Sequence, residues 1–245
     1  MASTIRLCIP VILCLVLALP SGLSSASTSI TLDERCPESQ ANGGALLSTG
    51  LGTNGDSTIV VDHGKGAILG GQLLDSGGQG VPNAFVCIYS SVVNSQATEF
   101  AGVVSTDAAG RYQFPVPSGP SRNLTAAYRS NQGPLTAWAL LQVRAIPTLR
   151  LAKTTIRNKQ YARFSGEIPG PGNDGVVVVL QVQLGKGWRV FRRYTTRNGG
   201  QFKMRYRFTR NFTPTLYLMR AQIAGAPGYP FLPGNSRPIE LSVYP

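Results

Sequence analysis

The sequence is 245 residues long and has a net charge of +12 from 23 basic and 11 acidic residues, although only 14% of its positions are charged. Together with 28 glycines and 17 prolines, this low charge density excludes a helical bundle, a coiled coil and a long disordered chain. The length admits one large domain or two ordinary domains.

Residues 1–26 have the pattern of a secretory signal peptide. Arg6 supplies the positive charge, Cys8 to Leu19 form an apolar run, and Ser24-Ser25-Ala26 is a small-residue cleavage site. The apolar run is too short for a transmembrane helix. We therefore expect a secreted, extracellular protein with no transmembrane segment after cleavage, in which residues 27–55 form a flexible polar segment.

Cleavage of the signal peptide leaves two cysteines, Cys36 and Cys87. In an oxidising compartment a lone pair of cysteines is usually bridged, so we predict a disulfide between the N-terminal segment and the strand that carries Cys87. The alternative is that Cys87 is a buried strand thiol and that Cys36 is unpaired.

From about residue 56 the chain consists of short β-rich runs separated by Gly, Pro, Asn and Asp, and no window of a dozen residues has helical periodicity. The runs expected in the first half are Thr58–Asp62, Ala67–Leu74, Asn83–Ser90, Gly102–Ser105, Arg111–Val116 and Ala137–Val143. This pattern predicts an all-β protein.

The chain also contains an internal repeat. Residues 64–73 match residues 159–168, residues 82–89 match residues 175–182, and residues 106–114 match residues 196–204. The first match places Gly71 beside Gly166, which is 95 positions further on. A repeat of this length predicts two tandem Ig-like or transthyretin-like β-sandwich domains, spanning 56–150 and 151–245.

The third match is a turn that ends in glycine and leads into an alternating strand. Gly110 and Gly200 are free to adopt a positive φ, and the strands that follow begin with Tyr112 and Phe202. We expect Asp107 to hold the first turn through its side chain. In the second turn Asn198-Gly199 should tolerate the left-handed geometry instead.

Three segments of the first unit resemble a known family: Leu69-Gly-Gly-Gln-Leu-Leu-Asp75, Gly80-Val-Pro-Asn-Ala-Phe-Val86 and Thr106-Asp107-x-x-Gly110-x-Tyr112-x-Phe114. They are similar to the carboxypeptidase regulatory-like and Cna B-type repeats, which are transthyretin-like β-sandwiches of secreted and surface proteins. The second unit is more similar to the Ig-like repeats that accompany such domains in bacterial exported proteins; it carries Gly166, Trp188, Phe202, Tyr206 and Gly228-Tyr-Pro-Phe231. The resemblance implies a non-catalytic module and specifies no ligand.

The residues that could support catalysis or metal binding have no suitable partners. Gly55-Asp56-Ser57 resembles the nucleophile block of secreted lipases, but the only histidine, His63, lies six positions further on in an adjacent strand. His63, Asp62 and Asp56 match no zinc or calcium spacing. We therefore expect no enzymatic activity, no cofactor and no metal site.

The positive charge is concentrated in the second unit. Residues 27–150 contain 7 basic and 8 acidic residues, whereas residues 151–245 contain 15 basic and 3 acidic residues. The strand from Phe202 to Phe208 alternates apolar and basic residues, so its cations should share one face. We expect the turn at 197–200 to pair this strand with 188–194 in a hairpin. Depending on the register, either Arg192 or the pair Arg189 and Arg193 would join the outer face of that strand. The binding residues predicted on this hairpin are Arg189, Arg192, Arg193, Lys203, Arg205 and Arg207.

The hypothesis from sequence is a non-catalytic interaction or structural module of the cell envelope or extracellular space. Its basic second domain would bind an anionic cell-wall polymer, a polysaccharide or lipid headgroups, and the neutral first domain would be a spacer or docking element. Nucleic acid is disfavoured because the protein is exported and has no recognised nucleic-acid-binding fold. The alternatives are a carbohydrate-binding accessory module that stacks aromatic residues on neutral glycans, a purely structural spacer, and a basic face that is only solvated.

Overall fold

The computed structural model describes residues 34–37, 46–130 and 133–245, and within these ranges it contains strands and turns but no helix. The predicted signal peptide lies outside the described residues. The strands are β1 Leu46–Leu51, β2 Thr58–Asp62, β3 Ala67–Leu74, β4 Phe85–Val92, β5 Glu99–Ser105, β6 Arg111–Val116, β7 Arg122–Ser130, β8 Gly133–Arg144, β9 Arg150–Leu151, β10 Thr155–Arg157, β11 Tyr161–Glu167, β12 Val177–Leu184, β13 Gly187–Thr195, β14 Gln201–Arg207, β15 Thr215–Ile223 and β16 Ile239–Tyr244.

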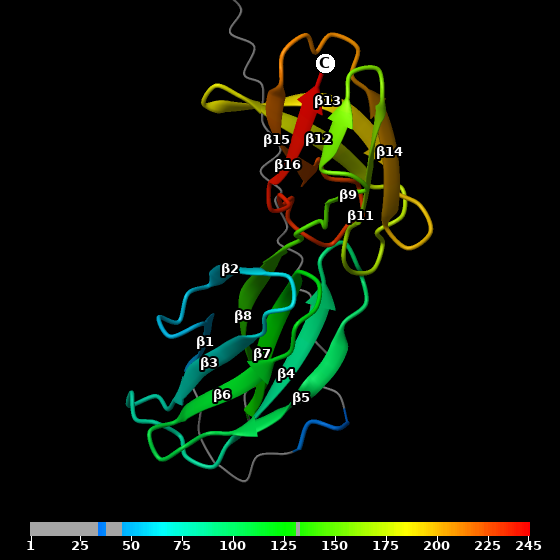
Figure 1. Cartoon of the computed structure of the whole chain (residues 1–245). Coiled ribbons are helices and arrows are strands. Elements are labelled where there is room, and N and C mark those ends of the chain that lie inside the picture. The colour runs from blue at the N-terminus through cyan, green and yellow to red at the C-terminus, as the bar shows by residue number, and fades with distance from the viewer. Residues whose placement is uncertain (1–33, 38–45, 131–132) are drawn as a thin grey trace, which may run out of the picture. The chain divides into compact units, whose positions relative to one another are not determined.

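The first eight strands form two sheets that face each other (Figure 1). One sheet has three strands in the order β1-β3-β6, and the other has five strands in the order β2-β8-β7-β4-β5. All neighbours are antiparallel except β2, which runs parallel to β8. We call this pair of sheets the first sandwich.

Strands β9 to β16 repeat the same topology in a second sandwich. Its three-stranded sheet has the order β14-β11-β9, and its five-stranded sheet has the order β10-β16-β15-β12-β13. The short strand β10 runs parallel to β16, as β2 does to β8. The prediction of an all-β protein built from tandem Ig-like sandwiches is confirmed.

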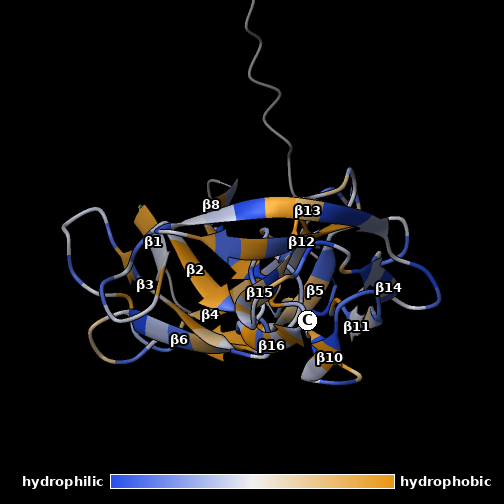
Figure 2. Ribbon diagram, turned by 45° about the horizontal axis from the view of Figure 1, so that its top comes forward, coloured by the Kyte–Doolittle hydropathy of each residue, from blue (hydrophilic) through white to orange (hydrophobic). Residues whose placement is uncertain are grey.

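Each sandwich is held together by apolar side chains that alternate toward the space between its two sheets. In the first sandwich Leu69, Ile88 and Leu141 are buried to within 1% of full burial, and in the second Leu180 and Phe202 are fully buried. The strands differ in hydropathy: β13 alternates between hydrophilic and hydrophobic residues along its length, whereas β2 and β4 are mainly hydrophobic (Figure 2). Burial of these faces is the main contribution to the stability of either sandwich.

The internal repeat is confirmed by matching contacts in the two three-stranded sheets. Gly71 is the register partner of Tyr112, and Gly166 is the register partner of Phe202. A Cβ atom on Gly71 would lie 2.5 Å from the Tyr112 hydroxyl, and a Cβ atom on Gly166 would lie 2.4 Å from the Phe202 ring. In both sandwiches, therefore, the missing side chain of the glycine provides the space for the aromatic ring of the neighbouring strand.

The turns before β6 and β14 both end in a glycine with a positive φ, Gly110 at 73° and Gly200 at 82°, but they differ in the residues before that glycine and in their supports. In the first, the Asp107 carboxylate accepts hydrogen bonds from the backbone N–H groups of Ala109, at 2.9 Å, and Arg111, at 2.8 Å, as predicted. In the second, Asn198 has a φ of 53° and Gly199 a φ of 76°, which confirms the predicted left-handed geometry.

A second support for this turn comes from outside it. The Asp174 carboxylate accepts hydrogen bonds from the N–H groups of Gly199, at 2.9 Å, and Gly200, at 3.0 Å. Asp174 precedes β12 and is far from the turn in sequence. It takes the place of the turn carboxylate that the second copy lacks, since Arg197 stands where Asp107 stands in the first copy.

The sequence match between β4 and β12 was wrong by one residue. It placed Cys87 beside Leu180, but the structure makes Cys87 equivalent to Val179. The β-bulges show this, because they fall between Ile88 and Tyr89 in one strand and between Leu180 and Gln181 in the other. From Val177 to Leu180 both faces of β12 are apolar and at least half-buried, so this part of the sequence carries no alternation that could specify the register.

The N-terminal side of the first sandwich is more ordered than we expected. We predicted a flexible polar segment over residues 27–55, but Leu46–Leu51 forms β1, which pairs along its whole length with β3. Leu47 and Leu51 are buried in the core. Thr49 lies on the same face as these two leucines and contacts the buried Tyr112, so the inward face of β1 is not uniformly apolar and the segment was not recognised as a strand.

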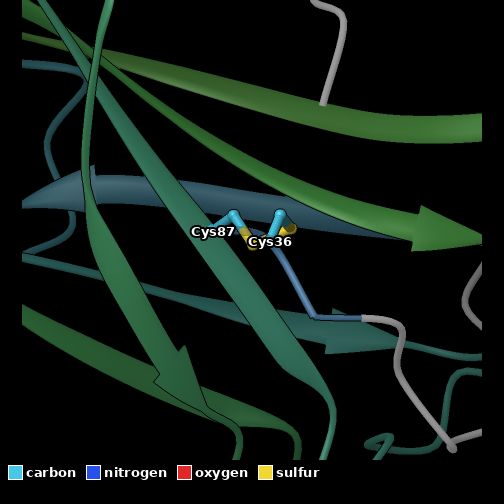
Figure 3. The surroundings of a disulfide bond; sticks show 2 residues. All are labelled: Cys36 and Cys87. Carbon is cyan, nitrogen blue, oxygen red and sulfur yellow. A yellow bond between two sulfur atoms is a disulfide. The ribbon is translucent and has the colours of Figure 1, made fainter. Parts of the chain in front are cut away.

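The predicted disulfide is confirmed. Cys36 and Cys87 are bonded, with their Cα atoms 5.8 Å apart and 51 positions apart in sequence (Figure 3). Cys87 points to the outer face of the five-stranded sheet, because its neighbours Val86 and Ile88 belong to the core on the other side. The bond therefore holds the segment around Cys36 against the outside of the first sandwich, where the Arg35 guanidinium also lies 4.7 Å from the centre of the Phe100 ring.

Candidate anion-binding surface

The alternation predicted for the basic strand is confirmed in β14. Phe202 and Phe208 are buried, and Met204 and Tyr206 are half-buried against the core. The basic residues between them are all exposed on the opposite side; they are Lys203, Arg205 and Arg207.

The predicted pairing of this strand with β13 is wrong. Strand β14 pairs with β11 in the three-stranded sheet, whereas β13 pairs with β12 in the five-stranded sheet. The turn at 197–200 therefore carries the chain from one sheet to the other, as the turn before β6 does in the first sandwich. Two strands joined by a short turn have the same sequence pattern whether they are neighbours in one sheet or belong to facing sheets. The choice is made by the packing of the whole sandwich.

The six predicted binding residues consequently lie on two surfaces. Lys203, Arg205 and Arg207 are on the outer face of the three-stranded sheet. The other three, Arg189, Arg192 and Arg193, are exposed on the edge strand β13.

Strand β11 adds to the cations of β14. Arg163 is the register partner of Arg205, Tyr161 that of Arg207, and Ser165 that of Lys203. On the far side of β11, Arg150 of β9 is the partner of Ser165. We call the resulting surface the basic face; it comprises Arg150, Tyr161, Arg163, Ser165, Lys203, Arg205 and Arg207.

Sequence reasoning missed Arg150 and Arg163. A signal for Arg163 was present, because Tyr161, Arg163 and Ser165 alternate with the inward residues Ala162 and Phe164. The predicted hairpin placed β13 and not β11 beside β14, so Arg163 was not expected on this face. Arg150 belongs to a two-residue strand that has no periodicity to detect.

Tyr161 organises two of the cations. Its ring, which is 49% exposed, lies 5.4 Å from the guanidinium carbon of Arg205 and 5.8 Å from that of Arg207. The Arg207 Nε–H also donates a hydrogen bond of 2.8 Å to the backbone carbonyl of Lys159. These contacts orient the two guanidinium groups while leaving N–H donors free to face solvent.

The basic face is not neutralised by acidic side chains. Among the described residues no carboxylate forms an ion pair with any of its cations; Glu167, at the end of β11, has the uncharged Gln201 as its partner. Arg163 and Arg205 face each other directly, and such like-charged cross-strand pairs destabilise a sheet. A shallow depression of about 390 Å³ lies among Arg163, Ser165, Lys203 and Arg205.

The aromatic residues of β13 are less available than the glycan hypothesis requires. Trp188 is half-buried, with the Arg220 guanidinium 4.2 Å from the centre of its ring. Phe191 and Tyr194 are also half-buried and pack against the core.

The described part of the chain contains no group of three or more His, Cys, Asp and Glu side chains placed to hold a metal ion. His63 packs against the Phe231 ring, with the ring centres 5.6 Å apart. The same part of the chain has no helix that could serve as a membrane span.

No family model and no curated protein matches the sequence. Solved structures similar to it include a tetra-tandem repeat from the extending region of a large adhesion protein, with 12% identity, a TM-score of 0.42 and coverage of 81% of this chain and 49% of that chain. The D1–D4 ectodomain fragment of ICAM-5 has 15% identity, a TM-score of 0.38 and coverage of 81% and 51%. The N-terminal four Ig domains of Dscam1 isoform 7.44 have 8% identity, a TM-score of 0.41 and coverage of 76% and 42%. This chain thus spans about half or less of each of these structures.

Proposed function

We propose that the protein is a non-catalytic, exported interaction module whose basic face binds a linear anionic polymer. The observation that carries this proposal is the group of five cations, Arg150, Arg163, Lys203, Arg205 and Arg207, which share one sheet face without an acidic partner. An anionic ligand would relieve the repulsion between Arg163 and Arg205, and this would contribute to its binding.

The shape of the face favours a polymer over a small anion. Alternate residues on one strand are about 6.7 Å apart, so the three cations of β14 extend over about 13 Å. The depression on this face is wide open to solvent, so a small anion in it would be only partly covered. A chain with repeated sulfate, phosphate or carboxylate groups can contact several of these cations at once, and each contact adds to the others.

The first sandwich would then act as a spacer or docking element. The disulfide supports export, since such bonds persist in oxidising compartments. We also propose that the first sandwich is related to the carboxypeptidase regulatory-like and Cna B-type domains that its sequence resembles.

Binding to dextran sulfate and to uncharged dextran of the same chain length tests the proposal. We expect dextran sulfate to bind and the affinity to fall steeply as salt rises from low to physiological concentration, because screening weakens contacts between exposed charges. The triple variant K203E/R205E/R207E should lose at least tenfold in affinity, since three contacts of about 0.5–1 kcal/mol each are replaced by repulsion.

The matched control is R189E/R192E/R193E, which changes the net charge by the same amount on β13. If both triple variants weaken binding equally, the attraction is due to the net charge of the domain and the basic face is not a site. If wild-type protein binds neither polymer, the spacer hypothesis replaces the proposal.

A second candidate function is recognition of neutral glycans, and one observation favours it. Trp138, on the outer face of β8, is 64% exposed. An exposed indole can stack on a sugar ring. Binding of uncharged dextran that is insensitive to salt and abolished by W138A would support this function in place of the first.

A further inference from the structure

The second sandwich contains an aromatic pocket that is distinct from the basic face. It lies where the two sheets separate, between the edge strands β13 and β14, and has a volume of about 550 Å³. Pockets that bind small organic ligands typically measure about 300–1,000 Å³.

The walls of the pocket are aromatic rings. The centres of Phe191 and Tyr206 are 5.3 Å apart, those of Tyr206 and Phe208 are 4.9 Å apart, and those of Phe208 and Tyr217 are 5.1 Å apart. These four rings come from β13, β14, β15 and the loop after β14, and they supply much of the apolar half of the lining.

Polar groups make up the other half of the lining; they come from Thr209, Arg210 and Asn211 in the loop after β14 and from the hydroxyls of Tyr206 and Tyr217. The Asn211 side-chain N–H donates a hydrogen bond of 2.8 Å to the Tyr217 hydroxyl. A lining that combines aromatic rings with polar groups suits a ligand that has both a hydrocarbon part and a polar part.

The opening of the pocket combines positive charge with apolar surface. Arg210 is exposed at the rim, and the guanidinium carbon of Arg192 lies 5.5 Å from the centre of the Tyr206 ring. Leu184, which also lines the pocket, is 57% exposed. A ligand that enters here meets hydrocarbon inside and cations at the entrance.

We propose that this pocket binds a single amphiphilic anion, namely an acyl chain that bears an anionic head group. The chain lies against the four aromatic rings, and the head group remains at the rim beside Arg192 and Arg210. This charge complementarity distinguishes the ligand from a neutral lipid or an alcohol.

Calorimetric titration with laurate below its micelle concentration tests the proposal. We expect saturable one-to-one binding with a negative heat-capacity change, which is the signature of apolar burial. Decanoate should bind more weakly by about fourfold for each methylene removed. Dodecanol, which has the same chain without the charge, should bind at least tenfold more weakly than laurate.

Two exposed rim positions offer variants that leave the core unchanged. R210E should weaken laurate binding and reduce the preference for laurate over dodecanol. L184D should weaken the binding of both laurate and dodecanol. R205E, a matched charge reversal on the basic face, should leave laurate binding unchanged.

Three results would overturn the proposal. The first is that wild-type protein does not bind laurate. The second is that R205E weakens laurate binding as much as R210E does, which would show that laurate is attracted only by the net charge of the protein. The third is binding to anionic vesicles without binding to monomeric laurate, which would make Leu184 and its surroundings a membrane contact and not the mouth of a ligand pocket.

Discussion

The two sandwiches share a strand order but present different chemistry at equivalent positions. In the first, the cross-strand pair Ile68 and Pro115 occupies the place that Arg163 and Arg205 occupy in the second. Gln113 similarly corresponds to Lys203. The comparison teaches that the topology depends on inward residues and on a few turns, whereas the outward residues of the same sheet are free to vary with function.

Removal of the disulfide should have the largest effect on stability. The effect should be confined to the first sandwich, because the residue equivalent to Cys87 in the second sandwich is Val179, which cannot form a disulfide. The double variant C36A/C87A should lose about 4 kcal/mol of unfolding free energy, because the bond closes a 51-residue separation in the unfolded chain. Urea denaturation measures this loss. An unchanged midpoint would show that the bond contributes nothing to folding.

Variants of the two equivalent glycines test whether Gly71 and Gly166 have the same steric role in the two sandwiches. A Cβ atom on Gly71 would lie 2.0 Å from the Ser48 carbonyl oxygen, and one on Gly166 would lie 2.1 Å from that of Thr148. G71A and G166A should each lower the unfolding free energy by about 3 kcal/mol, because the backbone or the neighbouring aromatic ring must move to make room for the added methyl group.

Gly70 provides the control for the glycine variants. Its Cβ would meet nothing closer than 3.4 Å, and the equivalent position in the second sandwich already holds Ser165. G70A should therefore be nearly neutral in thermal denaturation. A cost equal to that of G71A would contradict the steric argument.

Tyr112 and Phe202 differ only in a hydroxyl group, which makes the first sandwich sensitive to alkali. Burial raises the pKa of Tyr112 from 10.0 to about 12, an effect that a side-chain hydrogen bond with Thr49 partly opposes. Because the folded-state pKa is the higher one, the unfolded state loses its proton first, and stability falls as the pH rises from 10 to 12. The loss is complete above pH 12 and amounts to about 3 kcal/mol.

The Y112F variant isolates this contribution. In the wild-type protein the Tyr112 hydroxyl donates a hydrogen bond of 2.7 Å to the Ser48 carbonyl. Because Y112F lacks this bond, its unfolding free energy at neutral pH should be about 1 kcal/mol lower. Its stability should also decline less than that of the wild-type protein between pH 10 and 12. Urea denaturation at pH 8, 10 and 11 compares the two proteins. Parallel curves would mean that Tyr112 does not titrate differently in the folded and unfolded states.

The two turn carboxylates should have the smallest effects. D107A and D174A should each lose about 1–2 kcal/mol, because each leaves two backbone N–H groups without their acceptor. In the second sandwich R197D restores a carboxylate at the position that Asp107 occupies in the first. The two carboxylates accept from different N–H groups, since Asp107 binds those of Ala109 and Arg111 whereas Asp174 binds those of Gly199 and Gly200. The double variant D174A/R197D should therefore recover only part of the stability that D174A loses, and full recovery would show that the two turns are interchangeable.

Much of the architecture could be predicted from sequence because it depends on local chemistry. Glycine and proline punctuation and period-two alternation predicted the all-β class, and the lone pair of cysteines predicted the disulfide. The alternation of β14 predicted which of its residues are exposed. The repeat was also detectable, because Gly71 and Gly166 must accommodate the rings of Tyr112 and Phe202.

Only the tertiary structure decided which strands are neighbours. The pairing of β14 with β11, which brings Arg163 opposite Arg205, and the support of a distant turn by Asp174 depend on contacts between residues far apart in sequence. The one-residue shift in β12 has the same origin, since a strand that is apolar on both faces takes its register from its neighbours. The sequence therefore determined that the second domain is basic and which side chains of β14 face outward, and the packing of two sheets decided which of its cations form a common surface.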